Sequence, residues 1–94
     1  MNPSEYPIVG SFKNETTSDL TLHLELIPEE VILAPGHSVD LVAKPTDDLL
    51  PLSIEPVDGG YQIHACRAFD PDWHVRFNGK LLKAGNPTRL RDHE

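Results

Sequence analysis

The clearest pattern of hydrophobic and polar positions in this chain lies between residues 20 and 26. Leucine occupies every second position there and polar residues lie between them: Leu20, Leu22, Leu24 and Leu26, with Thr21, His23 and Glu25. A period of two places the leucines on one face of a β-strand and the polar side chains on the other. A helix would scatter the same leucines around its circumference. The pattern therefore predicts a strand that ends near Pro28, because proline lacks a ladder donor.

Two more short strands follow at once. Residues 31 to 33 are apolar, and Pro35-Gly36 is a turn signal, since proline suits the second position of a turn and glycine tolerates a positive φ. After the turn, Val39, Leu41 and Ala43 alternate with other residues. Three strands within 24 residues are typical of an antiparallel sandwich or barrel.

A hairpin is predicted around residues 58 to 60, whose sequence is Asp-Gly-Gly. Alternating strands precede it at 52–56 and follow it at 61–66. A two-residue turn at 58–59 places Ile54 opposite Ile63, and a turn at 59–60 places Ile54 opposite Ala65. Both choices match inward-facing residues, so the alternation of faces is the same in either case.

A second hairpin is predicted at Asn78-Gly79, the strongest two-residue hairpin signal in the chain. It pairs Phe77 with Lys80. Two residues further along each strand, residue 75 faces residue 82.

The first strand is predicted over residues 7 to 13, with Ile8 and Phe12 facing the core, and a polar turn follows at 14–19. Asn14-Glu15-Thr16 in that turn matches a glycosylation sequon, but no secretion signal accompanies it, so we interpret the match as chance.

Together these patterns predict an all-β fold, a two-sheet antiparallel β-sandwich of about seven strands with Ig-like or cupredoxin-like architecture. A small closed barrel is the alternative. Residues 1–83 are expected to form a single domain. Residues 84–94 are polar and are expected to be a disordered C-terminal tail.

The net charge of −7 and the pI near 5 oppose binding to nucleic acid or to anionic membranes. No apolar run approaches the ~20 residues that a membrane span needs. The first ten residues show no basic segment followed by an apolar one, so no signal peptide and a cytoplasmic location are expected. Cys66 is the single cysteine, which excludes an internal disulfide.

Several of these residues also carry a family resemblance. They are Asn14-Glu15, the leucines of 20–26, Leu33, Pro35-Gly36, Leu41-Val42-Ala43 and the 78–82 segment. In this pattern the chain resembles a group of small uncharacterised bacterial all-β proteins. The resemblance implies a fold class and no assigned activity.

The candidate chemistry lies on the later strands. If the 61–66 and 73–77 strands pair across the intervening loop, His64 or Cys66 lies opposite His74, with Cβ atoms about 4.5–5.5 Å apart. A thiolate with two imidazoles suits zinc or copper, and His23 or His37 could add a ligand. The simpler interpretation is a solvated sheet face and an inert cysteine. A Cys66 nucleophile is disfavoured, since no glycine-rich oxyanion turn follows it.

The loop that holds Phe69 and leads into Trp73 is the second candidate, because an aromatic loop at one end of a sandwich can bind a partner. Alternatively, Trp73 fills the core. We therefore expect a non-enzymatic cytoplasmic interaction module, monomeric or homodimeric, for a protein partner that the sequence does not identify. Addition of a partner strand to a sheet edge is a plausible binding mode. The alternative is a small zinc- or copper-binding protein that uses His64, Cys66 and His74.

Overall fold

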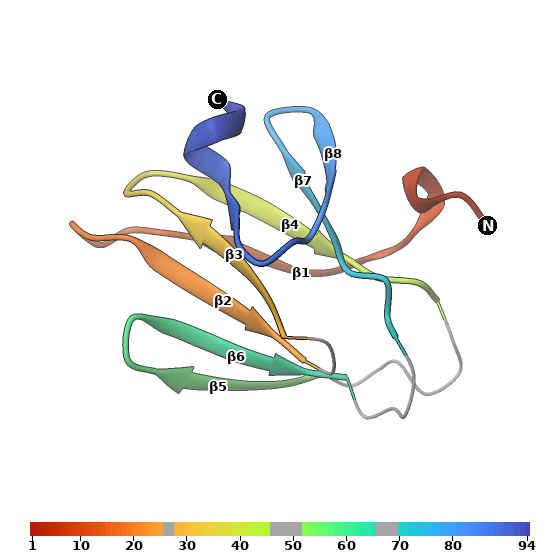
Figure 1. Cartoon of the computed structure of the whole chain (residues 1–94), viewed down its shortest axis with the longest axis horizontal. Coiled ribbons are helices and arrows are strands. Elements are labelled where there is room, and N and C mark those ends of the chain that lie inside the picture. The colour runs from red at the N-terminus through yellow and green to blue at the C-terminus, as the bar shows by residue number, and fades with distance from the viewer. Residues whose placement is uncertain (26–27, 46–51, 66–69) are drawn as a thin grey trace.

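The computed structural model describes residues 1–25, 28–45, 52–65 and 70–94, which form two packed β-sheets (Figure 1). The four-stranded sheet has the order β1 (Ile8–Lys13), β4 (Ser38–Val42), β7 (His74–Phe77) and β8 (Lys80–Lys83). The five-stranded sheet has the order β5 (Ser53–Val57), β6 (Gly60–His64), β2 (Leu20–Leu24), β3 (Glu29–Leu33) and β9 (Thr88–Arg89). Single-turn 3₁₀ helices, η1 (Pro3–Glu5) and η2 (Leu90–His93), lie near the two ends of the chain.

The predicted all-β sandwich is confirmed, and the two sheets are open rather than closed into a barrel. Two pairings differ from a purely antiparallel arrangement, because β2 pairs with β6 and β3 pairs with β9 in parallel. No helix among the described residues is long and apolar enough to cross a membrane.

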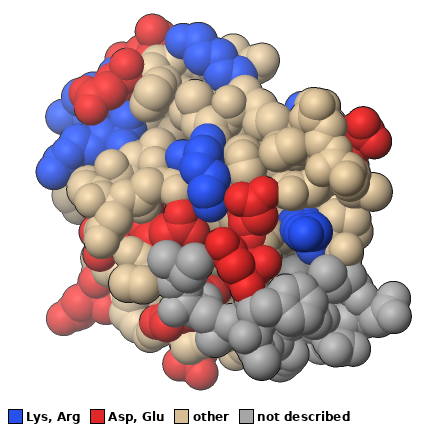
Figure 2. All heavy atoms as spheres, turned by 45° about the vertical axis from the view of Figure 1, so that its right-hand side comes forward, with Lys and Arg blue, Asp and Glu red and all other residues tan. Residues whose placement is uncertain are grey.

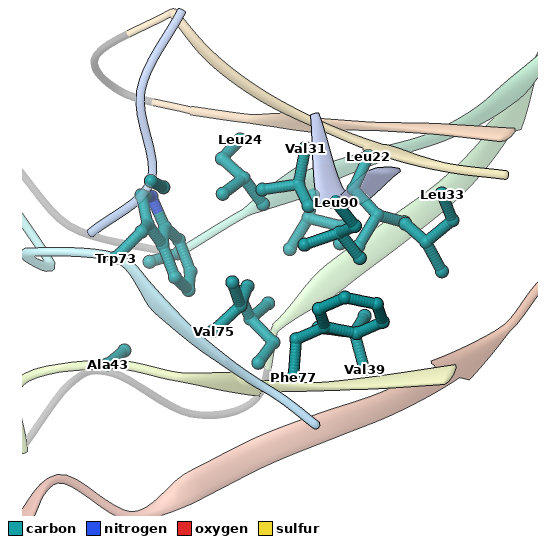
Figure 3. Packing of buried hydrophobic residues seen from close by; sticks show 14 residues of the cluster. Leu22, Leu24, Val31, Leu33, Val39, Ala43, Trp73, Val75, Phe77 and Leu90 are labelled. Carbon is teal, nitrogen blue, oxygen red and sulfur yellow. The ribbon is translucent and has the colours of Figure 1, made fainter. Parts of the chain in front are cut away.

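The alternating leucines form β2, which lies between β6 and β3. Leu22 and Leu24 are fully buried and Leu20 packs against the core from its margin. Figure 3 shows Leu22 and Leu24 facing Val75 and the Trp73 indole across the space between the sheets. The period-two prediction is confirmed over the part of this strand that the structure describes.

The turn at residues 35–36 carries the chain from one sheet to the other. Gly36 has φ +87°, and the His37 amide donates to the Ala34 carbonyl at 3.0 Å. The strands on either side therefore do not pair with each other, and β4 instead lies between β1 and β7.

Both predicted hairpins are confirmed. β5 and β6 are joined by residues 58–59, and Ile54 pairs with Ile63. β7 and β8 are joined by Asn78-Gly79, which pairs Phe77 with Lys80 and residue 75 with residue 82. Asn78 and Gly79 both have positive φ, as this hairpin turn requires.

The first predicted strand is present, but the prediction of which of its residues face inward is partly wrong. The pairing of β1 with β4 is irregular between Ile8 and Gly10, as at a β-bulge. Such an extra residue reverses the alternation. Val9 packs against the core, Ile8 is 55% exposed, and Phe12 packs inward as predicted.

The polar turn at 14–19 is organised by Asn14, which is fully buried. Its amide nitrogen donates to the carbonyls of Ser18 at 2.8 Å and Leu33 at 2.9 Å, and its oxygen accepts from the Thr16 amide at 2.9 Å and from the Thr16 hydroxyl. Asn14 thus satisfies the backbone of two segments.

The C-terminal segment is ordered, so the expectation of a disordered tail over 84–94 is wrong. β9 pairs with β3, and Gly85 forms an isolated bridge with Glu30. Leu90 is fully buried and lies among the core residues of β2 and β3 in Figure 3. The physical reason is that β3 would otherwise be an edge strand and the core beneath it would be open.

Candidate functional site

The residues of the predicted metal site do not come together as expected. β6, which carries His64, pairs with β5 and β2, whereas β7, which carries His74, pairs with β4 and β8. Ile63 and Val75 both point into the core, so the neighbouring histidines project from opposite outer faces of the sandwich. The predicted pairing of these two strands is therefore wrong. Cys66 lies outside the described residues.

Three of the five histidines have other partners. His23 Nδ1 lies 3.3 Å from Glu30 Oε2, His37 Nε2 contacts the Glu94 carboxylate, and the His74 Nδ1–H donates to the Asp72 carbonyl at 2.8 Å. Within residues 1–25, 28–45, 52–65 and 70–94, no group of three His, Cys, Asp or Glu side chains is placed to hold a metal ion.

The structure describes only the later part of the aromatic loop. Trp73 is fully buried, and its indole nitrogen donates to the Glu25 carbonyl at 2.9 Å. It fills the core, as the alternative interpretation predicts, and is not available as a surface anchor. Phe69 lies outside the described residues.

A group of polar side chains that no sequence pattern indicated lies at one end of the sandwich. We call it the Lys83 cluster, and its members are Tyr6, Glu29, Asp72, His74 and Lys83. Lys83 Nζ lies 3.3 Å from Asp72 Oδ1 and 3.4 Å from Glu29 Oε2, and the Tyr6 hydroxyl donates to Asp72 Oδ2 at 2.6 Å. Figure 2 shows acidic side chains close to a basic one near the centre of one face. The cluster joins segments that are far apart in the sequence.

The pKa directions of Tyr6, Asp72 and Lys83 argue against acid–base roles for these three groups near neutral pH. The hydrogen bond to Asp72 raises the pKa of Tyr6 to about 12 and lowers the pKa of Asp72. Burial lowers the pKa of Lys83, but the nearby Glu29 and Asp72 carboxylates outweigh it, so the pKa is raised. Tyr6 is thus held neutral, Asp72 ionised and Lys83 charged, whereas a general acid or base needs a pKa near the working pH.

Glu29 differs from its neighbours because burial raises its pKa above the ordinary 4.5, although Lys83 acts in the opposite direction. The residue is only 7% exposed, and its Oε1 has no hydrogen-bond partner among the described residues. A buried acceptor without a partner weakens the fold, so the ionised form of Glu29 is a strained member of the cluster.

The second distinctive feature is β5, the edge strand of the five-stranded sheet (Figure 1), all of whose residues are exposed. Phe12 of β1 contacts Tyr61 of β6, with ring centroids 6.2 Å apart. Among the described residues β1 is the edge of the other sheet, β5 extends beyond it, and no strand covers the inner face of β5. Ile54, on that inner face, is therefore 46% exposed, and Val57, on the outer face, is 38% exposed.

A shallow hollow of about 330 Å³ lies beside the end of β5. Its lining includes Leu20, Tyr61, Pro56 and Val57, with Asp19 on the polar side. The sequence did contain one signal for this edge, since a proline within a strand is confined to edges, and Pro56 is such a proline.

No protein-family model, curated protein or solved structure matches this chain. The resemblance to small uncharacterised bacterial all-β proteins stays a prediction, and the function has to be argued from the geometry of the chain itself.

Proposed function

We propose that this chain is a non-enzymatic, cytoplasmic interaction module that binds an extended segment of a partner protein along the free edge of β5. The observation that carries the proposal is that every residue of this strand is exposed, including Ile54 and Val57. Exposed apolar side chains on an unpaired edge are typical of surfaces that add a strand from another chain.

The free edge offers a defined set of backbone groups. In a two-residue hairpin the residues that flank the turn, here Val57 and Gly60, form a hydrogen-bonded pair. Hydrogen-bonded and non-bonded pairs then alternate, so the backbone groups of residues 54 and 56 point away from β6. Ile54 presents both an N–H and a C=O, whereas Pro56 presents only a C=O. A partner strand can therefore form its full pair of hydrogen bonds at Ile54.

Pro56 also limits the edge. A long, regular edge invites uncontrolled association, and proline is one of the devices that prevent it. The β5 edge thus favours a short segment centred near Ile54 over continuous stacking of sheets.

The test is comparative capture of partners from a cell extract with three immobilised proteins, the unchanged chain, Ile54→Lys and Ile8→Lys, identified by quantitative mass spectrometry. Ile8 is the matched control, because it is also an exposed isoleucine on an edge strand, but of the other sheet. Folding of each variant is checked by circular dichroism.

We expect Ile54→Lys to lose at least one protein that the unchanged chain and Ile8→Lys both retain. The same captured proteins from all three baits, or a loss only with Ile8→Lys, would contradict the proposal.

A further inference from the structure

We propose that the segment bound at the β5 edge is one in which apolar and basic residues alternate. This inference rests on the proposed function and adds the chemistry of the partner. It follows from the different character of the two faces that β5 presents to a neighbouring strand.

The inner face of β5 is apolar. Ile54 and Pro56 lie on it, and their partners on β6 are Ile63 and Tyr61. In a β-ladder, the side chain directly opposite a residue lies on the same face. A partner residue paired with Ile54 would therefore cover its exposed side chain, and an apolar residue is the one that gains from doing so.

The outer face of the same sheet carries an acidic row beside Ile54. A row of paired residues crosses four strands in the order Glu55, Gln62, His23 and Glu30. This row contains two carboxylates and no lysine or arginine. Glu55 forms no ion pair within the described part of the chain, and Asp58 follows in the adjacent turn.

Alternation follows from the register. Residues on either side of the one that pairs with Ile54 lie opposite Ser53 and Glu55, on the outer face. A lysine or arginine opposite Glu55 forms a favourable cross-strand pair, whereas a glutamate there is repelled. The net charge of −7 attracts a basic segment over a longer distance.

A second copy of this chain fits the edge less well. It carries the same net charge of −7, and its own β5 contributes Glu55 where the geometry favours a cation. The partner that this surface fits is therefore a different, basic protein segment.

The test is an NMR titration of the ¹⁵N-labelled chain with three seven-residue peptides at low salt. The first is Lys-Val-Lys-Val-Lys-Val-Lys, the second replaces every lysine by glutamate, and the third is the first with N-methylated valines. In the bound register the valine N–H groups would point towards β5. N-methylation therefore removes these hydrogen-bond donors and keeps the charge and side chains of the peptide.

We expect saturable shifts of the β5 and β6 amides with the lysine peptide. Affinity should fall at least about tenfold with the N-methylated peptide or in the variant Ile54→Gln, which loses the covered apolar area. It should fall about two- to fivefold in Glu55→Gln, because an exposed charge pair contributes little more than that.

Equal binding of the glutamate peptide at β5 would overturn the charge pattern and leave the proposed function standing. Equal binding of the N-methylated peptide, with shifts scattered over acidic residues, would show unspecific attraction and overturn the inference. If none of the three peptides shifts the β5 amides, the inference is also overturned. The capture experiment tests the proposed function separately. An Ile54-dependent dimer in light scattering would identify a second copy as the occupant and overturn the basic partner.

Discussion

Replacing Lys83 by methionine tests whether the Lys83 cluster stabilises the fold through charge. The ammonium group lies within 3.5 Å of Glu29, Asp72 and the Trp73 carbonyl, so the substitution removes two ionic contacts and one hydrogen bond. Methionine keeps most of the length and the apolar stem. The change therefore isolates the charge from the packing.

The expected loss is set by two opposing features. Removing one partner of a fully buried pair costs ~3–5 kcal/mol, because the other charge is left buried. The Lys83 side chain is 49% exposed, however, so water screens part of the interaction. We expect a loss of about 1–2 kcal/mol at neutral pH, intermediate between buried and surface pairs. In a domain of this size that lowers Tm by roughly 5–15 °C.

The loss should depend on pH through Glu29. Burial raises its pKa above 4.5 in the folded state, so this group favours folding below pH 4.5 and loses that contribution as pH rises through the folded pKa. Lys83 partly offsets the shift, and removing it raises the pKa of Glu29 further. The substitution should therefore cost less at about pH 3.5, where the contact with Asp72 still contributes but the contact with ionised Glu29 is lost, and the cost should grow towards neutral pH.

The assay is urea unfolding of the unchanged chain, Lys83→Met and Lys80→Met at both pH values, followed by tryptophan fluorescence. Lys80 is the control, because it lies on the same strand and is exposed, and among the described residues its ammonium group donates only to the His93 carbonyl. The double variant Glu29→Gln/Lys83→Met should lose less stability than the two single variants added together. We expect this difference, the coupling energy between Glu29 and Lys83, to be at least about 0.5 kcal/mol. A cost no larger than that of Lys80→Met, or one independent of pH, would refute this account of the cluster.

Three further predictions concern residues that join separate segments. Asn14→Ala should lower the free energy of unfolding by about 2–4 kcal/mol, measured by urea unfolding, because it leaves buried backbone groups unpaired. Leu90→Ala should cost ~2–4 kcal/mol, and hydrogen exchange should show β3 amides losing protection, since a fully buried leucine is removed. Absorbance at alkaline pH should show one tyrosine titrating near pH 12, and Tyr6→Phe should abolish that transition. The stability that Tyr6 contributes through this hydrogen bond is present below the unfolded pKa of about 10 and is lost as pH rises through about 12.

The local parts of the fold were predictable from the sequence because turn chemistry fixes register. Asn78-Gly79 accommodates two positive φ angles, and a two-residue turn leaves only one pairing of the flanking strands. The alternation of buried and exposed positions in β2 was predictable because its leucines occupy every second position and so share one face of the strand.

The neighbours of each strand were not predictable in the same way. The outward direction of His64 and His74 was expected correctly, but placing them together required knowing which sheet each strand joins. That choice depends on packing between residues far apart in the sequence. The C-terminal segment shows the same limit, since Leu90 is a single apolar residue in a polar stretch and its burial depends on the gap that β3 leaves.

The features of the β5 edge depend both on the local sequence and on packing between segments far apart in the sequence. The sequence indicates the inward alternation of Ile54 and, through Pro56, an edge position. The exposure of Ile54 depends instead on the unequal number of strands in the two sheets, because a four-stranded sheet that ends at β1 cannot cover the strand beyond β6. An apolar residue left uncovered in this way favours association, and Pro56 limits how far that association can extend. An edge that keeps an apolar side chain but lacks one backbone donor supports the proposal of a short, specific partner.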